Sequence, residues 1–161
     1  MRKKTQAILA YMLILLVTIV WLGAIFLAPY LKSRSDPRSA FFYFLFSPVC
    51  HQIPSRSFFI FGHSLAVCSR CLGVYSGILG GAILFPFFRG FSNLILPKTR
   101  IFILFSLPIA TDAMGNLLHL WRTSAEFRFV TGFIWGVILA FYLVVGIIDL
   151  SFKLWKRKPV A

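Results

Sequence analysis

Three cysteines and one adjacent histidine are the residues of this 161-residue sequence with the clearest capacity for chemistry. Two of the cysteines form a Cys-x-x-Cys pair, and the third is followed directly by the histidine. Two thiolates at that spacing can bind one tetrahedral ion, and zinc favours a set of three cysteines and one histidine. The sequence therefore predicts a metal site, with zinc as the expected ion, formed by Cys50, His51, Cys68 and Cys71.

Both the fourth ligand and the chemistry of the thiols have alternatives. His63 and His119 can replace His51, because adjacent residues chelate one ion only with some backbone strain. A Cys-x-x-Cys pair at a helix N-terminus also exchanges disulfides, which suits thiols outside the cytosol. A second interpretation is therefore a thiol oxidoreductase coupled to a membrane quinone, using Cys68 and Cys71. A third is that the cysteines are buried as small hydrophobic residues.

A second polar group lies within an apolar stretch. Asp112, Asn116 and His119 are spaced so that they share one face of a helix. An aspartate within a membrane costs at least about 2.5 kcal/mol, so it normally faces a partner, water or a functional cavity. We predict that Asp112 and Asn116 are catalytic residues in such a cavity. Asp112 would be a general base, a partner of a ligating histidine, or half of a buried ion pair. An interhelical hydrogen bond of purely structural value is the alternative.

Four arginines close to the ends of apolar stretches are candidates for binding an anionic group: Arg56, Arg70, Arg122 and Arg128. The paired N–H donors of arginine suit a phosphate or carboxylate, as in a lipid headgroup or an isoprenoid phosphate. Together with the metal site they predict a site that handles a lipid-like or anionic amphipathic substrate. Interfacial anchoring, or pairing with Glu126, is the alternative. If the protein supplies all four ligands, the metal site would be structural instead. A further alternative is that the protein is a non-enzymatic scaffold or a transporter subunit.

The composition indicates that helices in a membrane position these residues. Hydrophobic residues make up 59% of the chain and charged residues 13%, against about 45 to 50% and about 25% in soluble domains. Four stretches are long enough to cross a hydrocarbon core of about 30 Å: 7–28, 68–88, 101–121 and 129–150. We therefore predict an all-α fold, a four-helix integral membrane bundle, with residues 1–161 as one domain. The first helix is expected to stop at Pro29.

The distribution of the cations predicts a topology. The net charge is +13, and the cations lie between apolar runs, so we expect contact with the lipid bilayer and no nucleic-acid partner. With both termini in the cytoplasm, ten of the 17 Lys and Arg residues lie inside and seven lie outside beside the cysteines. We predict a multi-pass protein of the cell membrane with this orientation. Within the connection 31–67, the aromatic-rich piece 41–49 is too short to cross, which predicts an interfacial or re-entrant segment.

Small residues four positions apart predict where the helices meet, because they let backbones approach closely in lipid. Two such ladders occur, in the second and the fourth span: Gly73, Gly77, Gly81, Gly132, Gly136 and Ala140. We expect them either to pack against each other or to form a homodimer.

Read as one pattern, the polar residues resemble a family of small prokaryotic membrane proteins known as a domain of unknown function. Its signature is Cys-His-Gln, then Arg-Ser-Phe, then Cys-x-Arg-Cys-x-Gly-x-Tyr-x-Gly, and the segments 50–52, 56–58 and 68–77 match it. The family also has an Asp in a later span and an Arg-x-Ser to Arg-x-x-Thr-Gly stretch, matched by Asp112 and by residues 122–132. Where the family usually has Gln, this chain has Asn116, which keeps an amide. The resemblance spans about residues 50–136 and implies no particular reaction.

Overall fold

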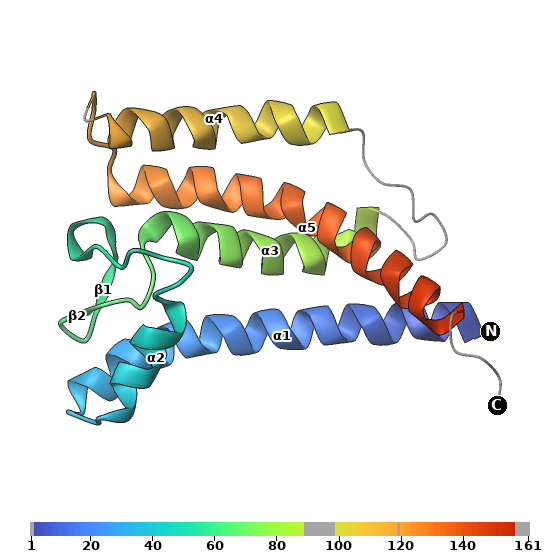
Figure 1. Cartoon of the computed structure of the whole chain (residues 1–161), viewed down its shortest axis with the longest axis horizontal. Coiled ribbons are helices and arrows are strands. Elements are labelled where there is room, and N and C mark those ends of the chain that lie inside the picture. Colours follow the sequence, from blue (N-terminus) through green and yellow to red (C-terminus); the bar gives the residue numbers. More distant parts are fainter. Residues whose placement is uncertain (1, 89–98, 119, 157–161) are drawn as a thin grey trace.

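The computed structural model describes residues 2–88, 99–118 and 120–156, and most of them are helical (Figure 1). The elements are α1 (Arg2–Ser33), α2 (Arg38–Phe46), the 3-10 turn η1 (Pro54–Arg56), β1 (Phe59–Ile60), β2 (His63–Ser64), α3 (Ser69–Phe88), α4 (Thr99–Leu117) and α5 (Ala125–Lys156). The four long helices run side by side in the order α4, α5, α3, α1. The start of α1 and the end of α5 lie together at one end of the molecule. We call the other end, formed by residues 31–71, 112–118 and 120–128, the polar end.

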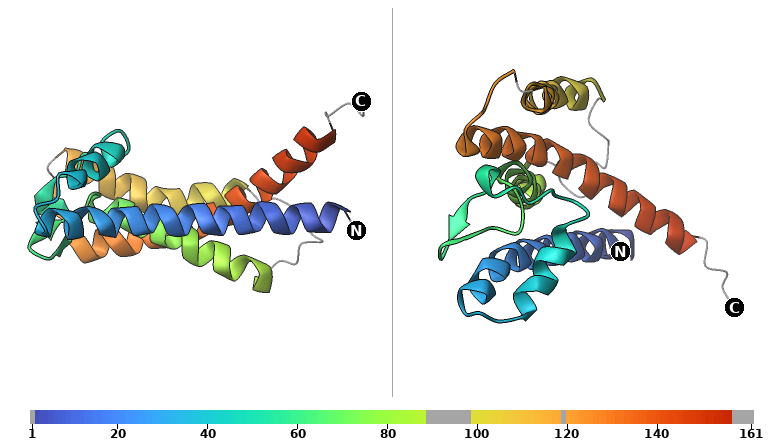
Figure 2. Two further views of the ribbon diagram at one scale, coloured as in Figure 1. Left: turned by 90° about the horizontal axis from the view of Figure 1, so that it is seen from below. Right: turned by 60° about the vertical axis from the view of Figure 1, so that its left-hand side comes forward.

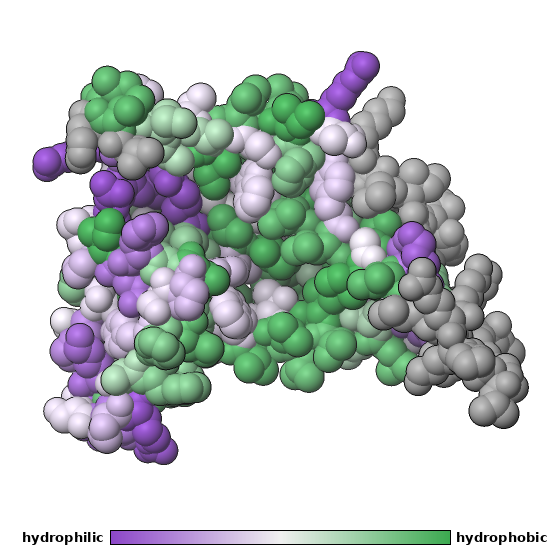
Figure 3. Space-filling view, in the orientation of Figure 1, coloured by the Kyte–Doolittle hydropathy of each residue, from purple (hydrophilic) through white to green (hydrophobic). Residues whose placement is uncertain are grey.

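Three of the long helices have the length and apolar composition needed to cross a membrane: Thr5–Ser33, Ser69–Phe88 and Ala125–Lys153. They confirm three of the four predicted spans. Within the described part of the chain, α4 does not join them, because its 19 residues include Arg100, Asp112 and Asn116. It nevertheless runs antiparallel beside α5 (Figure 2). Hydrophilic residues gather at the polar end, and apolar residues cover the middle of the face in view (Figure 3).

The prediction that Pro29 ends the first helix is wrong. The helix continues through Pro29 to Ser33, and the proline side chain is fully buried. Proline fixes a backbone angle that a helix can use, and it removes one backbone donor. Packing by neighbouring segments makes such an interior proline tolerable in an apolar helix. Prolines also lie inside α3 and α4: Pro86 is half-buried, whereas Pro108 is exposed.

The two glycine ladders pack against each other in a seam between α3 and α5. A Cβ atom added at Gly77 would overlap the carbonyl oxygen of Phe133, and one added at Gly136 would overlap that of Val74. Three more glycines are equally enclosed by the facing helix: Gly73, Gly81 and Gly132. Helices in lipid gain stability from such close backbone approach. Of the two predicted uses of these ladders, the structure contains the first, in which they pack against each other within one chain. A homodimer through the same faces would have to displace this packing.

The aromatic-rich piece predicted at 41–49 is mainly helical. It forms most of α2, which packs against α1. Phe46 is fully buried, and its ring meets that of Trp21 edge to face at a centroid distance of 4.9 Å. Burial of this large side chain anchors α2 on the bundle. Its interfacial or re-entrant position in a membrane stays a prediction.

A short hairpin, which the sequence analysis did not predict, closes the rest of the connection. Phe61 and Gly62 join its strands, and both have a positive φ, of 55° and 77°, as in the tight two-residue turns of hairpins. The Tyr43 hydroxyl donates to the carbonyl of Ser64 at 2.5 Å, and the Gln52 amide donates to the carbonyl of Tyr43 at 2.6 Å. These bonds tie the hairpin to α2 and bring the two ends of the connection together.

A cavity of about 420 Å³ lies between α1, α3 and α5, away from the polar end. We call it the apolar cavity. It is lined by Leu13, Ile14, Val17, Thr18, Trp21, Tyr75, Ile78, Leu143 and Ile147.

Candidate metal centre and arginine cavity

The three cysteines meet where the segment after α2 contacts the start of α3. The Cys50 N–H donates to the carbonyl of Phe46 at 3.0 Å, and the first helical bond of α3 joins the Leu72 N–H to the carbonyl of Cys68 at 2.9 Å. This places Cys68 and Cys71 in the first turn, and the Sγ atoms of all three cysteines lie within 4.8 Å of one another. A tetrahedral zinc ion, with Zn–S distances of about 2.3 Å, needs sulfurs about 3.8 Å apart. The three thiols therefore fit one ion with small side-chain adjustments.

Hydrogen bonds around the sulfurs favour the thiolate form of one cysteine. The Cys68 N–H donates to Cys50 Sγ at 3.1 Å. The pKa of the Cys68 thiol lies well below its usual range, because its sulfur accepts hydrogen bonds from the thiols of Cys50 and Cys71, and then from N–H groups at the start of α3. The pKa of Cys50 is raised, first by its hydrogen bond to Cys68 and also by burial. Thiolates are the form in which cysteines bind metals.

His51, the predicted fourth ligand, is not part of this cluster. Among the described residues, the cluster that could hold an ion contains Cys50, Cys68 and Cys71 only. The side chain of His51 is exposed, but it lines the same cavity as the three cysteines. Of the two alternatives, His63 lies in β2 and is also outside the cluster, and His119 lies outside the described residues. Among the described residues no fourth ligand joins the three cysteines, and a ligand role of His51 stays a prediction.

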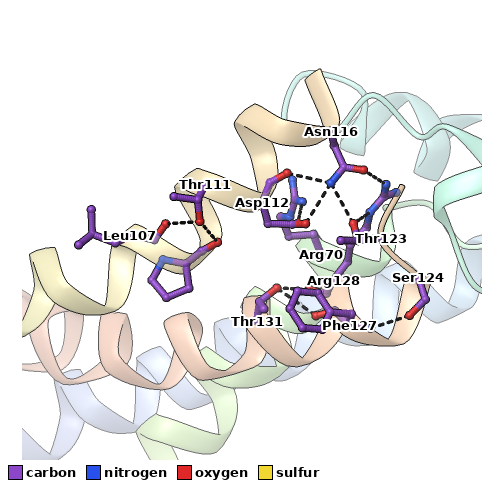
Figure 4. Close-up of polar contacts among 11 residues, drawn as sticks. Arg70, Leu107, Thr111, Asp112, Asn116, Thr123, Ser124, Phe127, Arg128 and Thr131 are labelled. Carbon is purple, nitrogen blue, oxygen red and sulfur yellow. Dashed lines mark hydrogen bonds and ion pairs between the residues drawn. The ribbon is translucent and has the colours of Figure 1, made fainter. Parts of the chain in front are cut away.

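A polar network joins α3, α4 and α5 beside the cysteines (Figure 4). Arg70 and Asp112 form an ion pair, and the Asp112 side chain is only 5% exposed. The Asn116 amide donates to Asp112 Oδ1 at 3.0 Å and to Thr123 Oγ1 at 2.9 Å. Arg128 in turn donates to the Asn116 carbonyl oxygen and, through Nε at 2.9 Å, to Thr123 Oγ1. Asp112 and Asn116, the described residues of α4 that were predicted from the sequence, both belong to this network.

Of the three roles predicted for Asp112, the geometry contains the ion pair. Its carboxylate meets the Arg70 guanidinium and the Asn116 amide, and its side chain does not line either of the two polar cavities beside it. Asn116 lines both cavities. A catalytic role for either residue stays a prediction.

The four predicted arginines line two adjoining cavities. The first, the metal cavity, has about 450 Å³ and contains the three cysteines, His51, Arg56, Arg70 and Arg128 in its wall. The second, the arginine cavity, has about 380 Å³ and is lined by Arg56, Arg122, Arg128, Asn116, Thr123, Trp121 and Ser55. The two cavities share Arg56, Asn116 and Arg128. Residues from four separate segments of the chain are thus gathered at the polar end.

Comparison with known proteins identifies a family. Residues 50–142 match the family described as "Predicted membrane protein" (DUF2085). The chain belongs to this family. The match begins at Cys50 and includes every described residue of the network and of the cysteine cluster. The resemblance inferred from the polar motifs is confirmed.

The relationship extends beyond the matched region. An uncharacterised protein of Methanocaldococcus jannaschii is 36% identical over 152 residues, which cover 91% of this chain and 97% of that protein. An uncharacterised protein of Methanothermobacter thermautotrophicus is 32% identical over 98 residues, which cover 59% of this chain and 84% of that protein. No solved structure matches the chain. The first alignment covers 91% of this chain and therefore includes at least part of the sequence of α1.

Sequence reasoning missed Thr123 and Trp121. Thr123 Oγ1 accepts hydrogen bonds from both Asn116 and Arg128, and Trp121 forms part of the wall of the arginine cavity. Both lie in the short connection between α4 and α5, where no periodic pattern shows which side chains point inward. The one local signal is the position of Thr123 between Arg122 and Arg128 of the family motif, with Trp121 directly before Arg122.

Proposed function

We propose that this DUF2085 protein holds a single zinc ion through the thiolates of Cys50, Cys68 and Cys71 at the polar end of a membrane bundle. The observation that carries the proposal is the convergence of three sulfurs within 4.8 Å from two segments separated by 17 intervening residues. Sulfur ligands in a tetrahedral set are typical of zinc and of iron–sulfur sites. A single cluster of three cysteines favours one ion.

The fourth position of the ion faces the metal cavity. Zinc sites that keep one position for a ligand other than the protein polarise a bound oxygen or activate water, whereas four-ligand sites are structural. The metal cavity has room for a small group, and its wall is apolar at Val49 and Ile53 and cationic at Arg56 and Arg70. This wall supports an amphipathic ligand with a negative group. Asp112 would then be a positioning residue that holds Arg70 at the cavity, and Asn116 would contact the ligand.

The proposed topology has four crossings, with α4 as the fourth. Its support is the position of α4, which runs beside α5, and the hydrogen bond at 2.8 Å from the Trp135 indole to Ser106. Four crossings return the end of α5 to the side on which α1 begins, as in Figure 1. By the excess of cations around the termini we place that side in the cytoplasm of the cell and the metal centre outside.

The test is the metal content of the detergent-purified full chain, measured by mass spectrometry of the elements. We expect about one zinc per chain in the wild type and less than a tenth of that in Cys50→Ser, Cys68→Ser and Cys71→Ser. His51→Ala separates an open from a closed site, and His63→Ala is its matched control. Retention of zinc in both histidine variants supports an open fourth position, and loss in His51→Ala alone makes His51 the fourth ligand.

The same samples distinguish the metal centre from a redox pair. Alkylation of the thiols before and after reduction, followed by mass spectrometry, counts the cysteines held in a disulfide. A protein without metal and with a reducible bridge between Cys68 and Cys71 would contradict the zinc proposal and favour thiol oxidoreductase activity. A metal-free protein with three free thiols would favour the scaffold.

A further inference from the structure

We infer that the arginine cavity is a binding site for a phosphoryl group, either free phosphate or the phosphomonoester headgroup of a lipid. The inference goes beyond the metal centre and does not require an ion there. Its basis is a buried cation that has no carboxylate partner, in a cavity walled by two further arginines.

Arg128 supplies the buried cation. It is only 7% exposed, and it donates hydrogen bonds to the neutral oxygens of Thr123 and Asn116. Burying a charge without a partner of opposite sign is costly unless hydrogen bonds or a ligand compensate for it. The carboxylate of Asp112, which also attracts Arg128, forms its ion pair with Arg70. Thr123 and Asn116 therefore hold the guanidinium in place and leave its charge for an anion.

Arg56 and Arg122 add two more cations to the same cavity. Over the described part of the chain, neither side chain has a hydrogen bond or an ion pair. Among the residues that the structure describes, no Asp or Glu lines the cavity. Arg56 and Arg128 already repel each other across it. A group with a double negative charge would convert this repulsion into attraction, and three guanidinium groups can offer it several N–H donors at once.

The charge balance favours a phosphoryl group over a carboxylate. A phosphomonoester has a charge of about −1.5 to −2 near pH 7 and three acceptor oxygens, which suits three arginines better than the single charge of a carboxylate. The cavity, at about 380 Å³, has room for such a group with part of what it is attached to. Trp121 in the wall and the exposed Leu118 and Leu120 beside it are typical of residues at a membrane interface. They allow a lipid headgroup to reach the arginines.

The experiment uses the full chain in detergent, with the zinc content determined on each sample, and two probes. The first probe is inorganic phosphate, titrated by calorimetry. The second is dioleoyl phosphatidic acid in mixed micelles, compared with dioleoyl phosphatidylcholine, whose phosphate is capped. Arg122→Gln and Arg56→Gln are the test variants, because neither side chain belongs to the polar network. Arg34→Gln, which removes an exposed cation of the polar end outside both cavities, is the matched control.

We expect saturable binding of a phosphoryl probe to the wild type and to Arg34→Gln, and at least tenfold weaker binding to Arg122→Gln and Arg56→Gln. Binding of inorganic phosphate identifies a soluble ligand, whereas binding of phosphatidic acid alone identifies a lipid headgroup, and either result supports the site. Absence of binding for both probes, or equal losses in Arg34→Gln, would overturn it. If purified protein that contains no zinc binds a phosphoryl probe, the arginine cavity is supported as a binding site and the metal centre is contradicted. The two proposals can therefore be tested independently.

Discussion

The apolar cavity and the metal cavity have nearly the same size, about 420 and about 450 Å³, but opposite chemistry. Helices α3 and α5 contribute to both. The wall of the apolar cavity consists almost entirely of hydrocarbon side chains, with the hydroxyl of Thr18 already bonded to the carbonyl of Ile14 at 2.7 Å. The wall of the metal cavity presents three thiols, a histidine and three guanidinium groups.

The difference predicts which cavity would bind a specific ligand. An apolar hollow in a membrane helix bundle can be filled by lipid chains without any directed contact, because lipid is as apolar as the side chains around it. Buried polar groups are retained only where partners compensate for their desolvation. The metal and arginine cavities keep such groups together, and binding should therefore depend on single residues there and not in the apolar cavity.

The largest expected effect comes from unpairing the polar network. Asp112→Asn leaves the charge of Arg70 without its carboxylate, and breaking a buried pair of this kind destabilises by about 3 kcal/mol or more. The measurement is the free energy of unfolding in mixtures of dodecyl maltoside and sodium dodecyl sulfate. Asp149→Asn is the matched control, since its pair with Lys153 is exposed and should contribute less than about 0.5 kcal/mol. Equal losses of unfolding free energy in the two variants would contradict the prediction that the Arg70–Asp112 pair stabilises the protein more than an exposed ion pair does.

A smaller effect is expected in the seam that supports both cavities. Gly77→Ala forces the added methyl group against the carbonyl oxygen of Phe133, so the two helices must separate, at a cost of about 2 kcal/mol. Gly23→Ala is the control, because nothing lies within 4 Å of a Cβ atom added there. Thermal unfolding in detergent would measure both. A Gly77→Ala variant as stable as the control would mean that α3 and α5 are not packed as closely as described.

The smallest effect belongs to the apolar cavity. Leu143→Ala enlarges a space that lipid can fill, so it should cost about 1 kcal/mol or less and leave zinc and phosphoryl binding unchanged. Ile148→Ala, on the same helix but fully buried between side chains, should cost at least about 2 kcal/mol. Detergent unfolding and zinc content measured on both variants test this order. Loss of zinc or phosphoryl binding in Leu143→Ala would mean that the apolar cavity contributes to ligand binding, which would contradict the difference between the two cavities.

The glycine spacing and the apolar runs indicated where α3 and α5 lie and which faces they use for contact, because period and side-chain size are local properties of a sequence. They left open whether these faces meet each other or a second copy of the chain. The start of α3 was predicted to within one residue, at 68 against Ser69. The length of α1 was not predicted, since whether a helix continues through a proline depends on the segments packed around Pro29. The hairpin was also missed, because its strands are two residues each and too short for a periodic signal.

The sequence by itself determined that this is a membrane protein of helices, which residue types it has for chemistry, and that Cys68 and Cys71 share one helix turn. Only the tertiary structure decided that Cys50 joins them and that Asp112 pairs with Arg70. It also decided that three arginines surround one cavity to whose wall the described part of the chain contributes no carboxylate. The physical reason is range. Hydropathy and helical spacing act between neighbours in the chain, whereas the partner of a buried charge is set by which helices pack side by side.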